Sequence, residues 1–164
     1  SGLDAGTALL LRHLPEPAPG DVVVDLGCGT GVVAATVAVR HPGVELVCCD
    51  ESFQAVDAAR RTVTPVAPTA AFHVADVLDG IADGSANVVL CNPPFHALGR
   101  GARPDIRRAL IAAAAAALRP GGRLWLVANR HLPYEHALGE GFAQVRTLAQ
   151  NGGFKIVEGE KARA

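Results

Sequence analysis

The stretch VVVDLGCGTG, residues 22–31, joins an apolar run to a loop with glycine at positions 27, 29 and 31. The apolar run predicts a buried strand, and residues 32–41 predict the helix that follows the loop. Glycine lets the chain turn sharply and lets a ligand approach the backbone closely. Free N–H groups at the start of the helix favour an anion such as a carboxylate. We interpret this loop as a ligand-binding loop, with a purely structural tight turn as the alternative.

The rest of the chain alternates strand-like and helix-like segments, which favours an α/β fold with a parallel sheet. Near the end, two strand-like runs flank Asn151-Gly152-Gly153, and strands joined by three residues must be antiparallel. We therefore expect one domain with five parallel strands and a terminal antiparallel hairpin. The expected helices span residues 4–14, 32–41, 53–63 and 105–118, and the expected strands span residues 22–26, 44–49, 71–74, 87–91, 123–128, 144–150 and 154–158.

The composition is that of a globular domain, with 164 residues, 49% of them hydrophobic and 19% charged. No apolar run reaches the ~20 residues that a membrane span needs. The six histidines and four cysteines show no metal-binding spacing, so we expect no metal and buried thiols in a reducing cytosol. The net charge of −1 does not by itself indicate a nucleic-acid binder. The chain has no methionine, so we expect a trimmed start or a piece of a longer protein.

Acidic residues follow the second and third expected strands. The carboxyl ends of parallel strands share one edge of the sheet, where open α/β sheets bind ligands. Asp50 stands where a carboxylate can accept hydrogen bonds from ribose hydroxyls, and Glu51 is the neighbouring candidate. Asp76 could accept from an adenine amino group. Each aspartate has a plainer alternative as a helix cap.

These features resemble the class I methyltransferases that depend on S-adenosylmethionine. The resemblance rests on DLGCGTG, Asp50, Asp76 and the tetrapeptide NPPF at residues 92–95, and it extends over the whole chain. It implies a Rossmann-like, doubly wound seven-stranded sheet, with S-adenosyl-L-methionine as cofactor and S-adenosyl-L-homocysteine as product. The cofactor contacts that it implies are Asp25, Gly27, Cys28, Gly29, Gly31, Asp50, Glu51, Asp76, Val77 and Asn92.

Three longer stretches, NPPFH, the opening GLDAGT and VANRHLPYEHALGE, are similar to the bacterial ribosomal RNA guanine-N2 methyltransferases. This similarity implies methyl transfer to the exocyclic N2 amine of a guanine, in the cytoplasm, with ribosomal RNA or a ribosomal subunit as partner. In that family this domain is the carboxyl-terminal catalytic half, preceded by a degenerate copy of the fold. We therefore expect residues 1–164 to be one domain of a longer protein, and a monomer. The sequence departs from the family at Ala86-Asn87, where Phe-Asp is usual, and we expect little effect on chemistry.

The segment CNPPFH, residues 91–96, has a chemical interpretation beyond an ordinary Asn-Pro turn. An exocyclic amine is a poor nucleophile because its lone pair is delocalised into the ring, so a catalyst must hold it with acceptors only. The side-chain oxygen of Asn92 and the backbone carbonyl of Pro93 are such acceptors. Pro93 and Pro94 lack N–H donors and fix the loop, and Phe95 offers a stacking face worth ~1–3 kcal/mol. We expect these four residues to be catalytic.

Basic residues near this segment and after the fifth strand could contact the RNA. Together with Phe95, we expect His96, Arg100 and Arg130 to bind the substrate. The alternative for the charged residues is an ordinary solvated surface.

Three other functions remain open. NPPF also suits a protein glutamine amide or an adenine N6 amine in DNA or RNA. The domain could bind the cofactor without catalysis, as half of a larger protein. A dehydrogenase is the weakest alternative, because Val32 stands where the GxGxxG fingerprint requires its third glycine.

Overall fold

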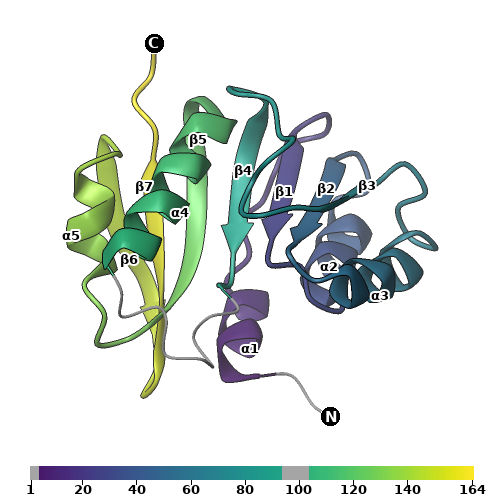
Figure 1. Cartoon of the computed structure of the whole chain (residues 1–164), viewed down its shortest axis with the longest axis horizontal. Coiled ribbons are helices and arrows are strands. Elements are labelled where there is room, and N and C mark those ends of the chain that lie inside the picture. Colours follow the sequence, from purple (N-terminus) through teal and green to yellow (C-terminus); the bar gives the residue numbers. More distant parts are fainter. Residues whose placement is uncertain (1–3, 94–103) are drawn as a thin grey trace.

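The computed structural model describes residues 4–93 and 104–164. Within them, seven strands form one sheet in the order β3-β2-β1-β4-β5-β7-β6 (Figure 1). The strands are β1 (Val22–Leu26), β2 (Glu45–Asp50), β3 (Ala71–Val74), β4 (Ala86–Cys91), β5 (Leu118–Asn129), β6 (Gln144–Gln150) and β7 (Phe154–Glu160). The helices are α1 (Ala5–Arg12), α2 (Val32–Arg40), α3 (Phe53–Val63), α4 (Pro104–Ala117) and α5 (Tyr134–Gly139).

The sheet is parallel from β3 to β5, and β7 inserts antiparallel between β5 and β6. Asn151 closes the hairpin between β6 and β7, because its side-chain oxygen accepts from the backbone N–H groups of Gly153 and Phe154 at 2.9 and 2.8 Å. The predicted doubly wound sheet with an antiparallel terminal hairpin is confirmed.

Helices cover both faces of the sheet, which explains why its central strands are mostly apolar. Helices α4 and α5 pack over one face, where Val24 and Val89 are fully buried. Helices α1, α2 and α3 pack over the other face, where Val23 and Leu90 are fully buried. Neighbouring residues of β1 thus enter opposite cores.

The junction between α4 and β5 differs from the sequence prediction. The sequence predicts a helix to residue 118 and a strand from residue 123, separated by the helix-breaking Pro120-Gly121-Gly122, but β5 begins directly after α4, at Leu118. Leu118 pairs with Ala86 of β4, and a register shift follows. Lys161 fixes both elements: its backbone bonds to Gly121 and Gly122, and its ammonium donates to the carbonyls of Ala115 and Leu118. The hydrogen bonds of Lys161, near the end of the chain, therefore outweigh the local tendency of Pro120-Gly121-Gly122 to separate the helix from the strand.

Two further features were not expected. The six-residue helix α5 follows Pro133 in a stretch for which no element was predicted. Asn87 of β4 accepts a hydrogen bond of 2.9 Å from the backbone N–H of Val22. This bond lies at the amino end of β1, away from the carboxyl edge. Asn87, one of the two residues at which the sequence departs from the family, therefore stabilises the sheet.

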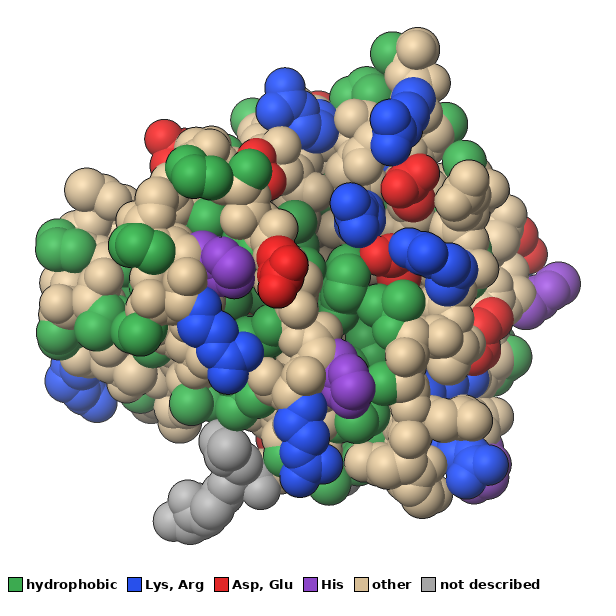
Figure 2. All heavy atoms as spheres, turned by 180° about the vertical axis from the view of Figure 1, so that it is seen from behind, with side chains coloured by type: hydrophobic (Ala, Val, Ile, Leu, Met, Phe, Trp, Pro, Cys, Tyr) green, Lys and Arg blue, Asp and Glu red, His purple; other side chains and the backbone are tan. Residues whose placement is uncertain are grey.

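The face of the molecule that points away from the viewer in Figure 1 carries charged side chains of both signs. Figure 2 shows lysine and arginine side chains interspersed with acidic ones on that face. In residues 4–93 and 104–164, no helix is long and apolar enough to cross a membrane. The same residues contain no cluster of three or more His, Cys, Asp or Glu side chains that could hold a metal ion.

Candidate active site

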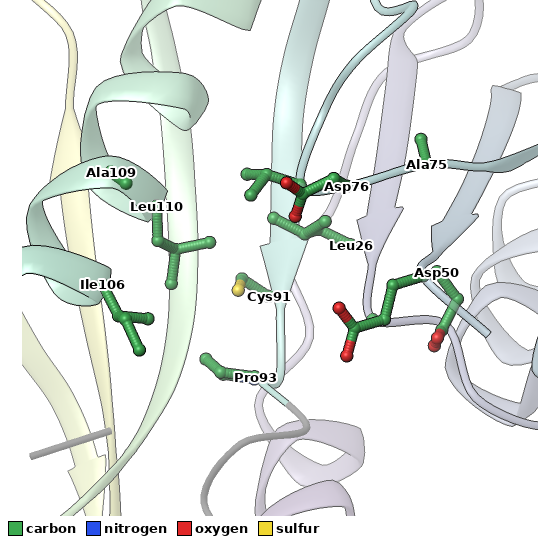
Figure 3. A pocket seen from close by; sticks show the side chains of 12 residues that line it. Leu26, Asp50, Ala75, Asp76, Cys91, Pro93, Ile106, Ala109 and Leu110 are labelled. Carbon is green, nitrogen blue, oxygen red and sulfur yellow. The ribbon is translucent and has the colours of Figure 1, made fainter. Parts of the chain in front are cut away.

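A cavity of about 280 Å³ lies at the carboxyl edge of the sheet, close to the lower end of the range for small-molecule sites. Its position matches the edge where the sequence predicted a ligand (Figure 3). The residues that line it come from the ends of β1, β2, β3 and β4 and from α4: Leu26, Gly27, Asp50, Glu51, Ala75, Asp76, Val77, Cys91, Pro93, Ile106, Ala109 and Leu110.

The two sides of the cavity differ in chemistry. Figure 3 shows Asp50 and Asp76 on one side and the aliphatic side chains of Ile106 and Leu110 on the other. The α4 residues were not predicted as site residues. Ile106 and Leu110 are four residues apart on a helix, so they share one face of it, and that periodicity was the available signal. An acidic wall facing an apolar wall suits a ligand with both hydroxyl and apolar parts.

The glycine loop turns as the sequence predicted. Gly27, Gly29 and Gly31 all have positive φ values, of 79°, 53° and 87°. The backbone N–H groups of Gly27 and Cys28 both donate to the carbonyl of Cys49, at 2.8 and 3.0 Å. Among these loop residues, Gly27 lines the cavity, whereas Cys28 is buried in the core on the α2 side of the sheet. Cys28 and Gly31 are both buried, and neither is among the residues that line the cavity.

Asp25 is buried beneath this loop and is 3% exposed. Its Oδ2 atom has no hydrogen-bond partner among the described residues. Burial, followed by the nearby charge of Asp50, raises the pKa of Asp25 to about 7, although the Ala34 backbone N–H opposes the shift. Asp25 is therefore placed to respond to a cationic group near the loop, without lining the cavity itself.

The raised pKa predicts a pH dependence of stability. The folded protein holds the Asp25 proton more tightly than the unfolded chain, whose carboxyl has a pKa near 3.8. The contribution of Asp25 to the free energy of unfolding should therefore be most favourable below pH 4 and fall by up to about 4 kcal/mol as the pH rises to 7. Asp25→Asn keeps an oxygen for the Ala34 N–H and should remove most of this fall.

Urea denaturation at pH 5 and pH 8 measures this effect. Asp25→Asn should stabilise the protein relative to wild type, and more so at pH 8 than at pH 5. Asp83→Asn, at an exposed carboxylate, is the matched control and should follow the wild-type profile. Parallel profiles of Asp25→Asn and wild type would contradict the prediction.

Asp50 and Glu51 play different parts at the end of β2. Asp50 is 6% exposed, and its two carboxylate oxygens accept from the backbone N–H groups of Gly29 and Ser52, at 3.1 and 3.0 Å. These bonds tie the glycine loop to the start of α3, where Ser52 is the N-cap as predicted. Glu51 is exposed and also lines the cavity. Because the Asp50 carboxylate already accepts two backbone hydrogen bonds, Glu51 is the predicted ribose contact whose carboxylate is better placed to accept from a ligand.

The acidic wall continues through Asp76 and Val77. Asp76 is exposed and lines the cavity after β3. Val77 has a φ of 54°, which is rare and costly for a β-branched residue. This strain is held at a residue that lines the cavity, as is common at ligand sites.

Asn92 and Pro93 lie directly after β4. Pro93 lines the cavity together with Cys91 (Figure 3). Asn92 is half-buried, and its side-chain nitrogen donates to Thr7 Oγ1 of α1 over 2.8 Å. Thr7 was not predicted as a site residue, although it belongs to the GLDAGT stretch.

The predicted substrate side is only partly described. Pro94, Phe95, His96 and Arg100 lie outside the described residues. Arg130 is exposed in the loop after β5, and its backbone N–H donates to the carbonyl of Gly153 over 2.9 Å.

Over 161 residues, the chain is 45% identical to the ribosomal RNA large subunit methyltransferase G of Streptomyces coelicolor, covering 97% of this chain and 42% of that protein. The protein of the same name from Streptomyces avermitilis is 43% identical over 160 residues, with 97% and 42% coverage. The chain thus spans about 42% of the length of these curated relatives.

Solved structures share the same fold. The T. thermophilus 16S rRNA N2 G1207 methyltransferase, in complex with AdoMet and guanosine, has a TM-score of 0.78 at 32% identity, covering 98% of this chain and 44% of that one. An O-methyltransferase family protein from Burkholderia thailandensis has a TM-score of 0.77 at 22% identity, covering 96% of this chain and 56% of that one, which shows the fold alone.

The sheet order, the glycine loop and the acid-lined cavity define a class I methyltransferase domain, a class that takes its methyl group from S-adenosylmethionine. More narrowly, the chain belongs to the methyltransferase small domain family, which it matches over residues 1–158. The family resemblance predicted from the sequence is confirmed.

Proposed function

We propose that this chain transfers the methyl group of S-adenosylmethionine to the exocyclic N2 amine of a guanine in ribosomal RNA, in the cytoplasm. The observation that carries this proposal is the Asn92 amide, whose NH₂ group is held by Thr7. Its carbonyl oxygen is then available to a substrate amine beside Pro93, which lines the cavity. The similarity to relatives named as ribosomal RNA methyltransferases, one of them an N2 guanine enzyme, supports the choice of substrate.

The residues of the cavity fit the cofactor. Asp76 and Glu51 present carboxylates suited to an adenine amino group and to ribose hydroxyls, and Ile106 and Leu110 offer an apolar surface. The buried carboxyl of Asp25 suits a nearby ammonium group. When bound, S-adenosylmethionine supplies an electrophilic methyl group on a sulfonium.

The role of Asn92 and Pro93 is to hold and orient the substrate amine. Their carbonyl oxygens accept its two N–H groups, which aims the nitrogen lone pair away from the base plane and towards the methyl donor. Pro93 has no N–H that could compete with the amine. A strong general base is not needed, because the alkylated amine becomes acidic and can lose its proton to water.

Transfer of a labelled methyl group tests the substrate. Ribosomal subunits, ribosomal RNA, DNA and release factor are each incubated with the protein and methyl-labelled S-adenosylmethionine, and the product nucleosides are identified by mass spectrometry. We expect N2-methylguanosine in ribosomal RNA. A label found in adenine or in a glutamine side chain would establish one of the rival N-methyltransferase functions. Absence of cofactor binding in calorimetry would favour a non-catalytic half.

Asp50, the last residue of β2, and Glu51, which follows it, should behave differently on substitution. We expect Glu51→Gln to weaken S-adenosylmethionine binding by about 10-fold, the effect of losing one charged hydrogen bond, and to leave unfolding unchanged. Asp50→Asn should lower the free energy of unfolding as well, because an amide has one oxygen and its NH₂ group would face the N–H of either Gly29 or Ser52, so that one of the two bonds is lost. Calorimetric titration and urea denaturation measure the two effects. Stronger loss of binding in Asp50→Asn without loss of stability would return the ribose contact to Asp50.

A further inference from the structure

A chain of hydrogen bonds joins the start of α1 to the end of β4. Thr7 Oγ1 accepts from Asn92 Nδ2 over 2.8 Å and donates to Asp4 Oδ2 over 2.9 Å. The backbone N–H of Thr7 donates to Asp4 Oδ1 over 2.7 Å, which makes Asp4 the N-cap of α1. Thr7 is 8% exposed, so its hydroxyl is largely sheltered from water.

The charge on Asp4 fixes the direction of every bond in this chain. An ionised carboxylate can only accept, so the single hydroxyl proton of Thr7 points to Asp4. The Thr7 oxygen is then left as an acceptor. Of the two polar groups of the Asn92 amide, the NH₂ group can donate to it and the carbonyl oxygen cannot. The carbonyl oxygen of Asn92 consequently lies on the other side of the amide, away from Thr7.

The local sequence explains how Thr7 reaches Asn92. Helix α1 packs on β5 and β7. A Cβ atom at Gly6 would lie 3.1 Å from Val127 Cγ1 of β5 and 3.4 Å from the ring of Phe154, so glycine allows the first turn of α1 to lie close on the sheet. Three of the four residues in the DAGT stretch thus have a physical reason: Asp4 caps the helix, Gly6 allows close approach and Thr7 supplies the hydroxyl.

We propose that Thr7, oriented by Asp4, is a positioning residue for methyl transfer, because it keeps the carbonyl oxygen of Asn92 facing the amine that is methylated. This inference rests on the proposed function of Asn92 as an acceptor. A flipped amide would present an NH₂ group to the substrate NH₂ group, donor against donor, and one of the two acceptors would be lost. Thr7 needs no contact with substrate or cofactor for this role.

Thr7→Val and Thr7→Ser in the full-length natural protein test the role of the hydroxyl. Valine has the same shape but no hydroxyl, and we expect it to lower kcat on ribosomal RNA by roughly 10- to 100-fold. The KM for RNA and the Kd for S-adenosylmethionine should stay within about 2-fold, and serine should restore kcat to within about 3-fold of wild type. Thr36→Val is the matched control, because the Thr36 hydroxyl donates to the carbonyl of Val32 within its own helix.

The substitution Asn92→Asp tests whether Thr7 acts by orienting the side chain of residue 92 or only by supporting the structure around it. A carboxylate presents oxygen on both sides, so its orientation does not need to be fixed. Thr7→Val should therefore lower kcat by less than about 2-fold in an Asn92→Asp background, whatever the starting rate. Asp4→Asn is a second probe: asparagine remains a good N-cap but can donate as well as accept, so kcat should fall with little loss of stability.

Nuclear magnetic resonance supplies a readout that does not depend on activity. We expect the side-chain NH₂ resonances of Asn92, identified by their loss in Asn92→Asp, to shift in Thr7→Val and to stay in place in Thr36→Val. Unshifted resonances, or an unchanged kcat in Thr7→Val, would overturn the inference. So would a weakening of S-adenosylmethionine binding in Thr7→Val by more than about 10-fold, which would make Thr7 a cofactor contact. If wild-type protein leaves ribosomal RNA unmethylated, the proposed function fails, and the NMR comparison still decides whether Thr7 orients Asn92.

Discussion

Asn92→Ala is expected to abolish detectable methyl transfer, a loss on the order of 10³-fold in kcat. The substitution removes the side-chain acceptor and leaves only the backbone carbonyl of Pro93 to orient the amine. It also leaves Thr7 without the NH₂ group that it now accepts from. Because the acids proposed to contact the cofactor line the cavity from the ends of β2 and β3, the Kd for S-adenosylmethionine should change by no more than a few fold.

Single-turnover kinetics with methyl-labelled cofactor and calorimetric titration separate these two effects. Asn87→Ala is a matched control, because it removes an amide from the same strand at its opposite end, where Asn87 bonds to Val22. That control should lower stability and leave kcat near the wild-type value. Near-normal turnover in Asn92→Ala would remove the acceptor role from Asn92.

The central strands and the glycine loop could be predicted because their signals are local. Residues 22–26 are apolar except for Asp25, as expected of a buried parallel strand, and the glycines follow them directly. The hairpin was predictable for the same reason, since Asn151 acts on residues two and three positions away. In each case the residues that determine the structure are neighbours in the sequence.

The rest of the site depends on partners that are distant in sequence. Asp50 was predicted to face a ribose, yet both of its oxygens bond to backbone, and one of these bonds reaches Gly29, 21 residues away. Thr7 and Asn92 are 85 residues apart. Neither pairing leaves a periodic pattern, so residue type alone identified Asp50 and Asn92 as polar groups at the correct edge without revealing what holds them.

Gly31→Ala is expected to lower the free energy of unfolding by about 2–4 kcal/mol, the sum of a strained backbone and an overpacked core. Gly31 has a φ of 87°, and a Cβ atom there would lie 2.9 Å from the Cα of Ala59 in α3. Backbone cannot yield as a flexible side chain can, so α2 and α3 would have to move apart, and the glycine loop would move with them.

Gly29→Ala separates the two causes of this loss. Gly29 also has a positive φ, of 53°, but within residues 4–93 and 104–164 no atom beyond its chain neighbours lies within 4 Å of the position its Cβ would take. It should therefore cost only the backbone strain, about 1–2 kcal/mol. Urea denaturation of both variants measures the difference, and equal losses would show that the contact with Ala59 relaxes freely. A larger loss at Gly31 would mean that this glycine of DLGCGTG is required by the packing of α2 on α3, and that the loop owes its shape to the helices behind it.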